Sequence, residues 1–189
     1  MSRHPGLHPP PFETIVTGKD DNSILLKQSY CYPRGGGQPG DTGVIFSEGF
    51  RVSKLHEVLP GDMILHPVDD VSKFQIGQEV TCEIDTERRN GNTLMHTSQH
   101  IVSAIAEDLW GAETVGNQIG PKQSRVDLFF ENKEIFDSDT LIEEVNSVLS
   151  SNINVNIHNW NRKKIIGHDQ MRHTKFMHRI PKSITHFQS

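Results

Sequence analysis

Residues 93–106 read Thr-Leu-Met-His-Thr-Ser-Gln-His-Ile-Val-Ser-Ala-Ile-Ala. They separate two parts of the sequence that favour different secondary structure. Leu94, Ile101 and Ile105 recur near helical spacing, and no proline interrupts the run. The pattern predicts a helix over about residues 86–110. The sequence before this helix favours strands, whereas the sequence after it mixes strands and helices. We therefore expect an α+β fold.

The ends of this helix have local signals of their own. Asp85 precedes the first turn and belongs to a residue type favoured as an N-cap. Gly111 follows the last periodic residue, where a left-handed helix end favours glycine. Gly91 lies inside the helix and costs about 1 kcal/mol relative to alanine, so the start of the helix is less well defined than its end.

The first part, residues 1–84, is predicted to be a small β-barrel-like domain or sandwich. Short runs of β-branched and aliphatic residues alternate there with turns rich in glycine and proline. The expected strands cover residues 23–26, 43–46, 63–65 and 79–84.

The second part, residues 85–189, is expected to pack helices on an antiparallel sheet. Asp139 or Thr140 is the expected N-cap of its second helix. The expected strands cover residues 115–119, 125–130 and 153–157, and the expected helices after the first cover residues 139–150 and 167–178.

Basic residues gather near the end of the sequence. Residues 160–189 hold seven of the 19 basic residues and one of the 24 acidic residues, although the chain as a whole has a formal net charge of −5. Such a basic stretch on an acidic protein predicts a surface that contacts nucleic-acid phosphates, beginning with Arg162, Lys163 and Lys164. The alternative is a solvated basic face on a terminal helix.

The two cysteines, Cys31 and Cys82, form no Cys-x-x-Cys motif and indicate no disulfide framework, which favours a reducing compartment. The N-terminal residues lack the apolar core of a signal peptide. No run approaches the roughly 20 apolar residues of a membrane span. We expect a cytoplasmic protein without a membrane partner.

His96 and His100 stand four residues apart on the predicted helix and therefore share one face. Neutral imidazole is a common zinc ligand, so the pair is a candidate metal site. A solvated or hydrogen-bonded pair is the alternative. Thr97 follows the first histidine, where a metalloprotease of the His-Glu-x-x-His type needs glutamate as its general base, so peptide hydrolysis of that kind is disfavoured.

A glycine-rich stretch, Cys-Tyr-Pro-Arg-Gly-Gly-Gly-Gln-Pro-Gly-Asp-Thr-Gly, covers residues 31–43. Gly35, Gly36 and Gly37 allow the backbone to approach another chain segment closely and leave amides available for an anion or a carbonyl. The stretch lacks the Gly-Lys-Ser/Thr ending of a P-loop, so ATP binding is not expected. The alternative is a flexible turn between strands.

Four segments in a fixed order resemble the editing domain of alanyl-tRNA synthetases. They look closest to the free-standing AlaX proteins of the longer type, which keep the N-terminal β domain. The resemblance covers about residues 23–186, and Ile-Pro-Lys-Ser-Ile at residues 180–184 also looks like the family's linker to its last strands. The four segments are Gly-Gly-Gly-Gln-Pro-Gly-Asp-Thr-Gly (35–43), the histidine pair, Val-Gly-Asn-Gln-Ile-Gly (115–120) and Arg-Val-Asp-Leu-Phe (125–129).

The resemblance implies an aminoacyl-tRNA deacylase that hydrolyses serine, and sometimes glycine, from mischarged tRNA(Ala) in a zinc-containing cleft. One Zn²⁺ per chain is implied, with His96 and His100 matching the family's first two ligands. Gln118 matches a glutamine beside the substrate, and Thr97 is a candidate substrate contact in the catalytic region. The implied substrate- and tRNA-binding residues are Gly35, Gly36, Gly37 and Gln38 together with Arg162, Lys163 and Lys164.

The bland alternatives for these residues stay open. Gln118 would be an ordinary core amide, Thr97 a helix-surface residue, and the glycine stretch chiefly a packing element between the two domains. Arg125 and Asp127 match strand positions of the family that favour a structural role.

The sequence departs from the family pattern at its end. The family's other metal ligands come from a Cys-x-x-x-His after the isoleucine-proline segment, and this sequence contains no such motif. Two imidazoles alone do not complete a zinc site. The chain is then either shortened or a variant with a weakened site. The absent strands would leave an exposed sheet edge, which favours a homodimer.

Two other functions compete with deacylation. The first is a tRNA-binding or regulatory module that keeps the fold and the basic tail without catalysis. The second is a small-molecule metallohydrolase, which is disfavoured because the histidine motif contains no acid/base carboxylate.

Overall fold

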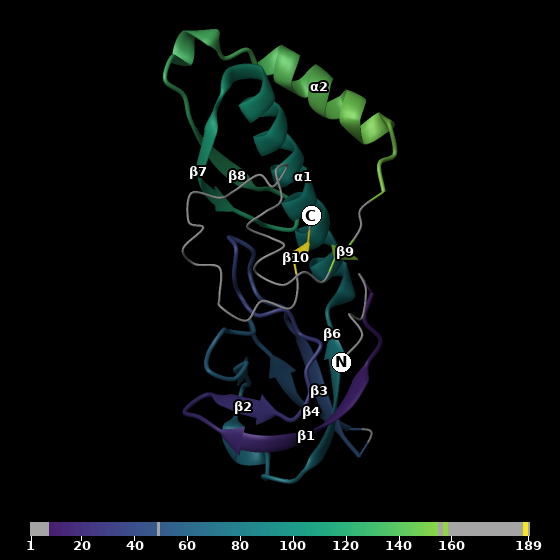
Figure 1. Ribbon diagram of the computed structural model, residues 1–189. Helices are drawn as coiled ribbons and strands as arrows, with labels where there is room; N and C mark the ends of the chain where they lie inside the picture. The colour runs from purple at the N-terminus through teal and green to yellow at the C-terminus, as the bar shows by residue number, and fades with distance from the viewer. Residues whose placement is uncertain (1–7, 49, 155–156, 159–186, 189) are drawn as a thin grey trace. The chain divides into compact units, whose positions relative to one another are not determined.

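The structure is a computed structural model, and it describes residues 8–48, 50–154, 157–158 and 187–188 (Figure 1). By its internal contacts the chain divides into two compact units. The first unit comprises Met1–Thr97 and Asn117–Arg125, and the second comprises Ser98–Gly116 and Val126–Ser189. Each unit is described by itself below. The boundary expected after residue 84 stays a prediction.

The first unit contains a six-stranded sheet in which all paired strands are antiparallel. Its strand order is β4-β3-β6-β1-β2-β5. The strands are β1 (Phe12–Lys19), β2 (Ser23–Leu26), β3 (Gly43–Ser47), β4 (Phe50–Leu55), β5 (His66–Pro67) and β6 (Glu79–Ile84).

The two edge strands of this sheet meet, so the sheet is curled. Leu55 at the end of β4 forms an antiparallel bridge with Val68, directly after β5. The N–H of His56 donates to the carbonyl of Pro67 over 2.8 Å. Curling of this kind pairs backbone groups that would otherwise be exposed at two open edges.

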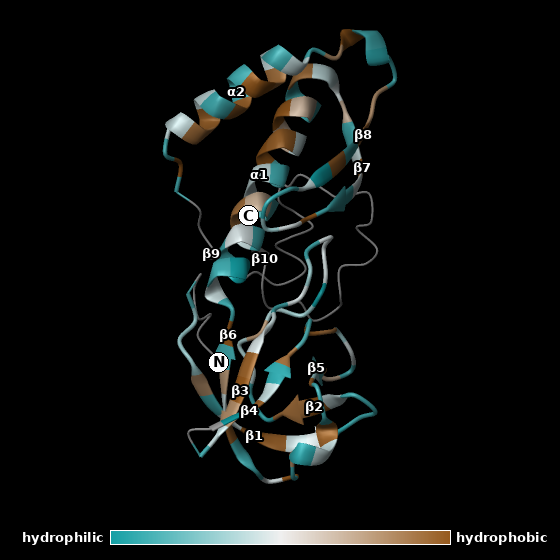
Figure 2. Ribbon diagram, turned by 180° about the vertical axis from the view of Figure 1, so that it is seen from behind, coloured by the Kyte–Doolittle hydropathy of each residue, from teal (hydrophilic) through white to brown (hydrophobic). Residues whose placement is uncertain are grey.

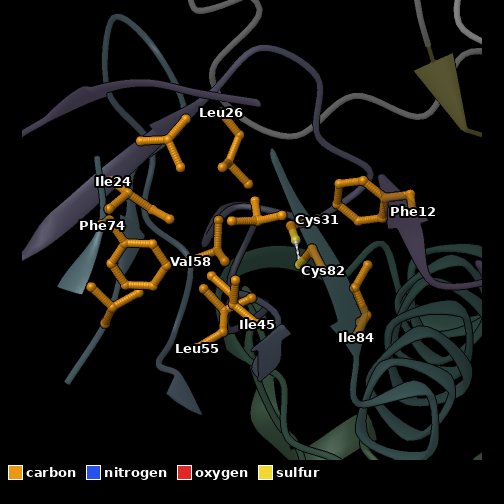
Figure 3. Close-up of a cluster of buried hydrophobic side chains, with 13 residues drawn as sticks. Phe12, Ile24, Leu26, Cys31, Ile45, Leu55, Val58, Phe74, Cys82 and Ile84 are labelled. Atoms are coloured by element: carbon orange, nitrogen blue, oxygen red, sulfur yellow. Dashed lines mark hydrogen bonds between the residues drawn. The ribbon is translucent and has the colours of Figure 1, made fainter. Parts of the chain in front are cut away.

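Alternation of buried and exposed residues produces the core inside the curl. In β6, for example, Val80, Cys82 and Ile84 are buried and the residues between them are not. The removal of each large aliphatic or aromatic side chain from water contributes about 1.5–3 kcal/mol. The hydrophobic side chains of this core cluster with no exposed surface are Val16, Ile24, Ile45, Leu55, Val58 and Phe74, together with Cys82. Figure 3 shows the cluster, with Ile24, Phe74 and Cys82 among its labelled residues.

The long helix α1 (Thr86–Trp110) has the predicted bounds and both predicted ends. The Asp85 carboxylate accepts a hydrogen bond from the N–H of Arg88 over 2.9 Å, as an N-cap does. Gly111 has φ +65°, and its N–H donates to the carbonyl of Glu107 over 2.7 Å.

The helix tolerates Gly91 because another segment approaches it there. A Cβ placed on Gly91 would lie 3.0 Å from the carbonyl oxygen of Pro121 and 3.1 Å from its Cβ. The absent side chain thus lets the segment after β7 lie directly against the first turns of α1. Glycine lowers the stability of the helix relative to alanine, and the close packing of Pro121 explains why it is present at this position.

The elements after α1 complete the mixed α+β character that the sequence predicts. Trp110, Phe130 and Phe136 form an aromatic cluster with ring centroids 5.3–6.2 Å apart. Apolar and polar residues alternate along α2 (Figure 2). The elements are β7 (Glu113–Gln118), which pairs with β8 (Arg125–Phe129), then α2 (Ser138–Ser150), and β9 (Ile157–His158), which pairs with β10 (Phe187–Gln188). Two short 3₁₀ helices, Val71–Lys73 and Lys133–Ile135, complete the described elements.

Two details of the sequence prediction are wrong. The cap of α2 is Asp137 rather than Asp139 or Thr140, because the Asp137 carboxylate accepts from the N–H of Thr140 over 2.7 Å. Residues 63–65 form no strand beyond an isolated bridge at Leu65, and the short strand begins at His66 instead.

Some strands were not predicted, and one predicted helix lies outside the described residues. Strands β1 and β4 were not expected. The helix expected near residues 167–178 lies outside the described residues. Within the part of the chain that the structure describes, no helix has both the length and the apolar character needed to cross a bilayer.

Candidate functional site

The glycine-rich stretch contains a tight turn at residues 35–38. The N–H of Gly35 donates to the carbonyl of Gln38 over 3.0 Å, and the N–H of Gln38 donates back to the carbonyl of Gly35 over 2.9 Å. Gly36 and Gly37, the two central residues, have φ +57° and +80°. Two positive values of φ are typical of a type I′ turn, which glycine forms without steric cost.

A buried ion pair lies behind this turn. The Asp41 carboxylate receives the guanidinium of Arg89 through two hydrogen bonds, one of them 2.7 Å long, and both side chains are buried. The same carboxylate accepts from the N–H of Tyr32 over 2.7 Å. The hydroxyl of Tyr32 donates to the carbonyl of Gly35 over 3.0 Å. Charge pairing thus anchors the base of the loop to α1.

His96 contacts the turn directly. Its Nδ1 lies 2.9 Å from Oε1 of Gln38, whose side chain is 4% exposed. A Cβ placed on Gly36 would lie 3.5 Å from Cε1 of His96. An amide oxygen can only accept, so Nδ1 donates and the neutral ring carries its lone pair on Nε2.

The segment that ends β7 meets the turn as well. The N–H of Ile119 donates to the carbonyl of Gly37 over 2.8 Å, and Nδ2 of Asn117 donates to the carbonyl of Gly36 over 3.4 Å. A Cβ on Gly37 would fall 1.8 Å from Oδ1 of Asn117, so only glycine fits. Three stretches that are far apart in sequence therefore converge inside the first unit.

The proposed catalytic residues lie close to this convergence along the chain. Gln118 has an exposed side chain and is flanked by Asn117 and Ile119, which both bond to the turn. Thr97 follows His96 on α1 and is half-buried. Their assignment to the site rests on this placement and stays a prediction.

His100 is one helical turn beyond His96, and i and i+4 positions share a helix face. It falls in the second unit of the chain and is exposed at its surface. Desolvation by neighbouring groups lowers the pKa of its imidazole below the ordinary value, because it disfavours the charged ring. A neutral imidazole is the form that can bind a metal ion.

The metal site expected from the histidine pair stays a prediction. Among the described residues, no group of three or more histidine, cysteine or acidic side chains could together hold an ion. Cys31 and Cys82 are buried in the core of the curled sheet with their sulfurs 3.8 Å apart (Figure 3). His96 fits the ligand role by its chemistry, because metal-bound histidines usually donate their second ring N–H to an oxygen acceptor.

A row of buried and half-buried polar side chains on α1 was not predicted from the sequence. Asn92 has no exposed surface, and neither polar atom of its amide has a hydrogen-bond partner among the described residues. Nε2 of Gln99 donates to Oγ of Ser103 over 2.8 Å. Polar residues at alternating spacings of three and four along a helix that should bury apolar ones are a signal visible in the sequence. The row comprises Arg89, Asn92 and Gln99, which are buried, and His96 and Ser103, which are half-buried.

The predicted tRNA contacts Arg162, Lys163 and Lys164 lie outside the described residues. The structure therefore brings together the glycine turn, Gln38 and His96, and it leaves the basic tail as a prediction.

Residues 10–88 match the family of class II (A) tRNA synthetases. The alanyl-tRNA editing protein AlaX-M of Saccharolobus solfataricus is 36% identical over 153 residues, which are 78% of this chain and 62% of that protein. AlaX-M of Methanosarcina barkeri is 33% identical over 159 residues, 80% of this chain and 64% of that protein. The alanine–tRNA ligase of Methanothermobacter thermautotrophicus is 36% identical over 119 residues, 62% of this chain and 13% of the ligase. The chain thus spans less than two thirds of the length of each of these relatives.

Proposed function

The chain is a relative of the alanyl-tRNA editing proteins and of the alanine–tRNA ligases, and from this premise we propose that it is a trans-editing hydrolase. Its substrate would be tRNA(Ala) mischarged with serine or glycine, and its reaction the hydrolysis of the aminoacyl ester. The observation that carries the proposal is the contact between His96 and Gln38, beside a glycine turn that also binds the segment before and after Gln118.

His96 and His100 would hold one Zn²⁺ per chain, with further ligands from outside the described residues. A bound zinc ion polarises a carbonyl and lowers the pKa of a water molecule, which are the two requirements of ester hydrolysis at neutral pH. The residues of the chain orient the reactants around it. Gly35, Gly36 and Gly37 of the turn carry no side chain that could block an aminoacyl group beside His96.

Gln118 and Thr97 are the proposed polar contacts of the substrate. An amide or hydroxyl that hydrogen-bonds the serine hydroxyl would be left unpaired by the methyl group of alanine. A site of this kind would reject the correctly charged tRNA, because a polar group that the bound substrate covers and leaves unpaired costs free energy. The exposed side chain of Gln118 is available for such a contact.

The basic residues Arg162, Lys163 and Lys164 are proposed to contact the tRNA backbone. Each phosphate contact releases counterions, so tRNA binding should weaken steeply as salt is added.

The test is release of serine from Ser-tRNA(Ala) by the purified chain loaded with zinc, compared with release of alanine from Ala-tRNA(Ala). We expect Ser-tRNA(Ala) to be hydrolysed faster by up to about 100-fold, because a buried polar group left unpaired costs about 1–3 kcal/mol. A chelator should abolish the difference. Equal slow release from both substrates, unchanged by the chelator, would contradict the proposal.

The small number of candidate ligands among the described residues supports a second function, a tRNA-binding module without catalysis. Zinc content separates the two functions. Less than about 0.2 equivalents of zinc per chain would favour the binding module, because two imidazoles alone hold zinc weakly.

A further inference from the structure

Gln38 is a buried amide held in one place by its own backbone. Its N–H and its carbonyl both bond to Gly35 across the turn, and its side chain is 4% exposed. The two central glycines of this turn have positive φ, as its backbone conformation requires. The side chain therefore reaches His96 from a backbone that two hydrogen bonds of the turn hold in place.

The contact selects one of the two neutral forms of the imidazole. Oε1 of Gln38 lies 2.9 Å from Nδ1 of His96 and has no proton to donate. The ring proton must then reside on Nδ1, and the lone pair on Nε2. The atoms of the ring nearest to a Cβ on Gly36 are Cε1 at 3.5 Å and Nε2 at 4.0 Å, so this nitrogen lies on the side of the turn.

We propose that Gln38 is a positioning residue that fixes the His96 ring in the Nδ1–H tautomer and so presents Nε2 to whatever electrophile the site binds. The inference rests on the proposed function only in naming that electrophile as zinc. Oxygen acceptors behind a metal-bound histidine orient the ring, and their loss weakens metal affinity by about 10–100-fold.

The chain offers three informative variants. Gln38→Leu removes the acceptor and keeps a side chain of similar size. Gln38→Glu keeps an acceptor oxygen at the same reach. Gln28→Leu is the matched control, because Gln28 is exposed and its amide bonds only to the hydroxyl of Tyr30 among the interactions that the structure describes.

The primary measurement needs no zinc and no tRNA. Long-range ¹H–¹⁵N spectra of the full, metal-free chain, at a pH of about 8 where histidine is neutral, distinguish a protonated Nδ1 from a protonated Nε2. We expect the Nδ1–H form of His96 in the parent, in Gln38→Glu and in Gln28→Leu, and a shift toward the Nε2–H form in Gln38→Leu.

A protonated Nε2 in the parent, or an unchanged tautomer in a folded Gln38→Leu, would overturn the inference. If Gln38→Leu does not fold, the parent and Gln38→Glu decide, since both must show Nδ1–H. The second measurement is zinc affinity by competition with a chelator, where Gln38→Leu should bind about 10–100-fold more weakly than Gln28→Leu. A correct tautomer in a chain that neither binds zinc nor deacylates tRNA would refute the proposed function and leave the positioning role of Gln38 intact.

Discussion

Replacing Gly37 by alanine tests how closely the glycine turn and the end of β7 are packed. Gly37 has φ +80°, and a Cβ there would fall 1.8 Å from Oδ1, 2.6 Å from Cγ and 3.1 Å from Nδ2 of Asn117. Gly77 is the matched control, because it has φ +90° but nothing within 4 Å of its Cβ position. Both substitutions impose the same kind of backbone strain, and only the first adds a collision.

The strain alone should cost about 1–2 kcal/mol, the penalty for a side chain in the left-handed region, and Gly77→Ala should lose that amount. Gly37→Ala should lose about 1–3 kcal/mol more, the usual cost of overpacking. Displacement of Asn117 also breaks its hydrogen bond to the carbonyl of Gly36, which is part of that loss. The expected total is about 2–5 kcal/mol in the free energy of unfolding.

Urea denaturation of the three proteins measures the difference, provided that their m-values agree. A third variant isolates the collision. Asn117→Ala removes all three atoms nearest to the new Cβ, so adding it to Gly37→Ala should recover much of the extra loss. Equal destabilisation by Gly37→Ala and Gly77→Ala, within about 0.5 kcal/mol, would refute the close approach.

Three further predictions concern the ion pair, a helix cap and the basic tail. Asp41→Ala leaves the guanidinium of Arg89 buried without its carboxylate, so it should lower the free energy of unfolding by about 3–5 kcal/mol in urea denaturation. Replacing both residues by apolar ones should recover most of this loss. A loss below about 1 kcal/mol for Asp41→Ala would contradict a buried pair. Hydrogen bonds from the first turn of α2 lower the pKa of the Asp137 carboxyl from its ordinary 3.8, so its capping contribution is full above that value and is lost as pH falls through the lower folded-state pKa. Asp137→Asn keeps a cap without a charge, so its thermal unfolding should lack this acid-dependent loss. Identical pH profiles for the parent and the variant would show that the carboxylate does not cap the helix. Charge reversal at Lys163 and Lys164 should lower the slope of log affinity for tRNA against log salt by about one unit per lost phosphate contact, and an unchanged slope would place these side chains away from the tRNA.

The elements that were predictable from the sequence are those with local signals. Helix α1 has the predicted bounds because Asp85 and Gly111 determine its ends within one turn. The periodicity predicts helix α2, but its cap was misplaced because four consecutive residues, Asp137 to Thr140, are all favoured cap types. Strand β4 was missed because Arg51 and Lys54 interrupt its apolar pattern, and its pairing with β3 is a tertiary property.

The candidate site follows the same division. The glycine stretch, His96 and the segment around Gln118 each carry a recognisable pattern, so the sequence indicated them separately. Their contacts were not predictable, because the Gln38–His96 bond joins residues 58 positions apart and depends on both side-chain conformations. The buried pair of Asp41 and Arg89, 48 positions apart, was not predicted because charged residues in a sequence are usually expected to be exposed.

The comparison of His96→Ala with His56→Ala in serine release from Ser-tRNA(Ala) tests the central claim most directly. His56 is an exposed histidine paired with Asp69 and bears no relation to the glycine turn, so its removal controls for the loss of an imidazole elsewhere in the chain. The account predicts that His96→Ala lowers the rate by about 100-fold or more, as expected when a metal ligand is lost, while His56→Ala retains the parent rate. Equal rates in the two variants would contradict it.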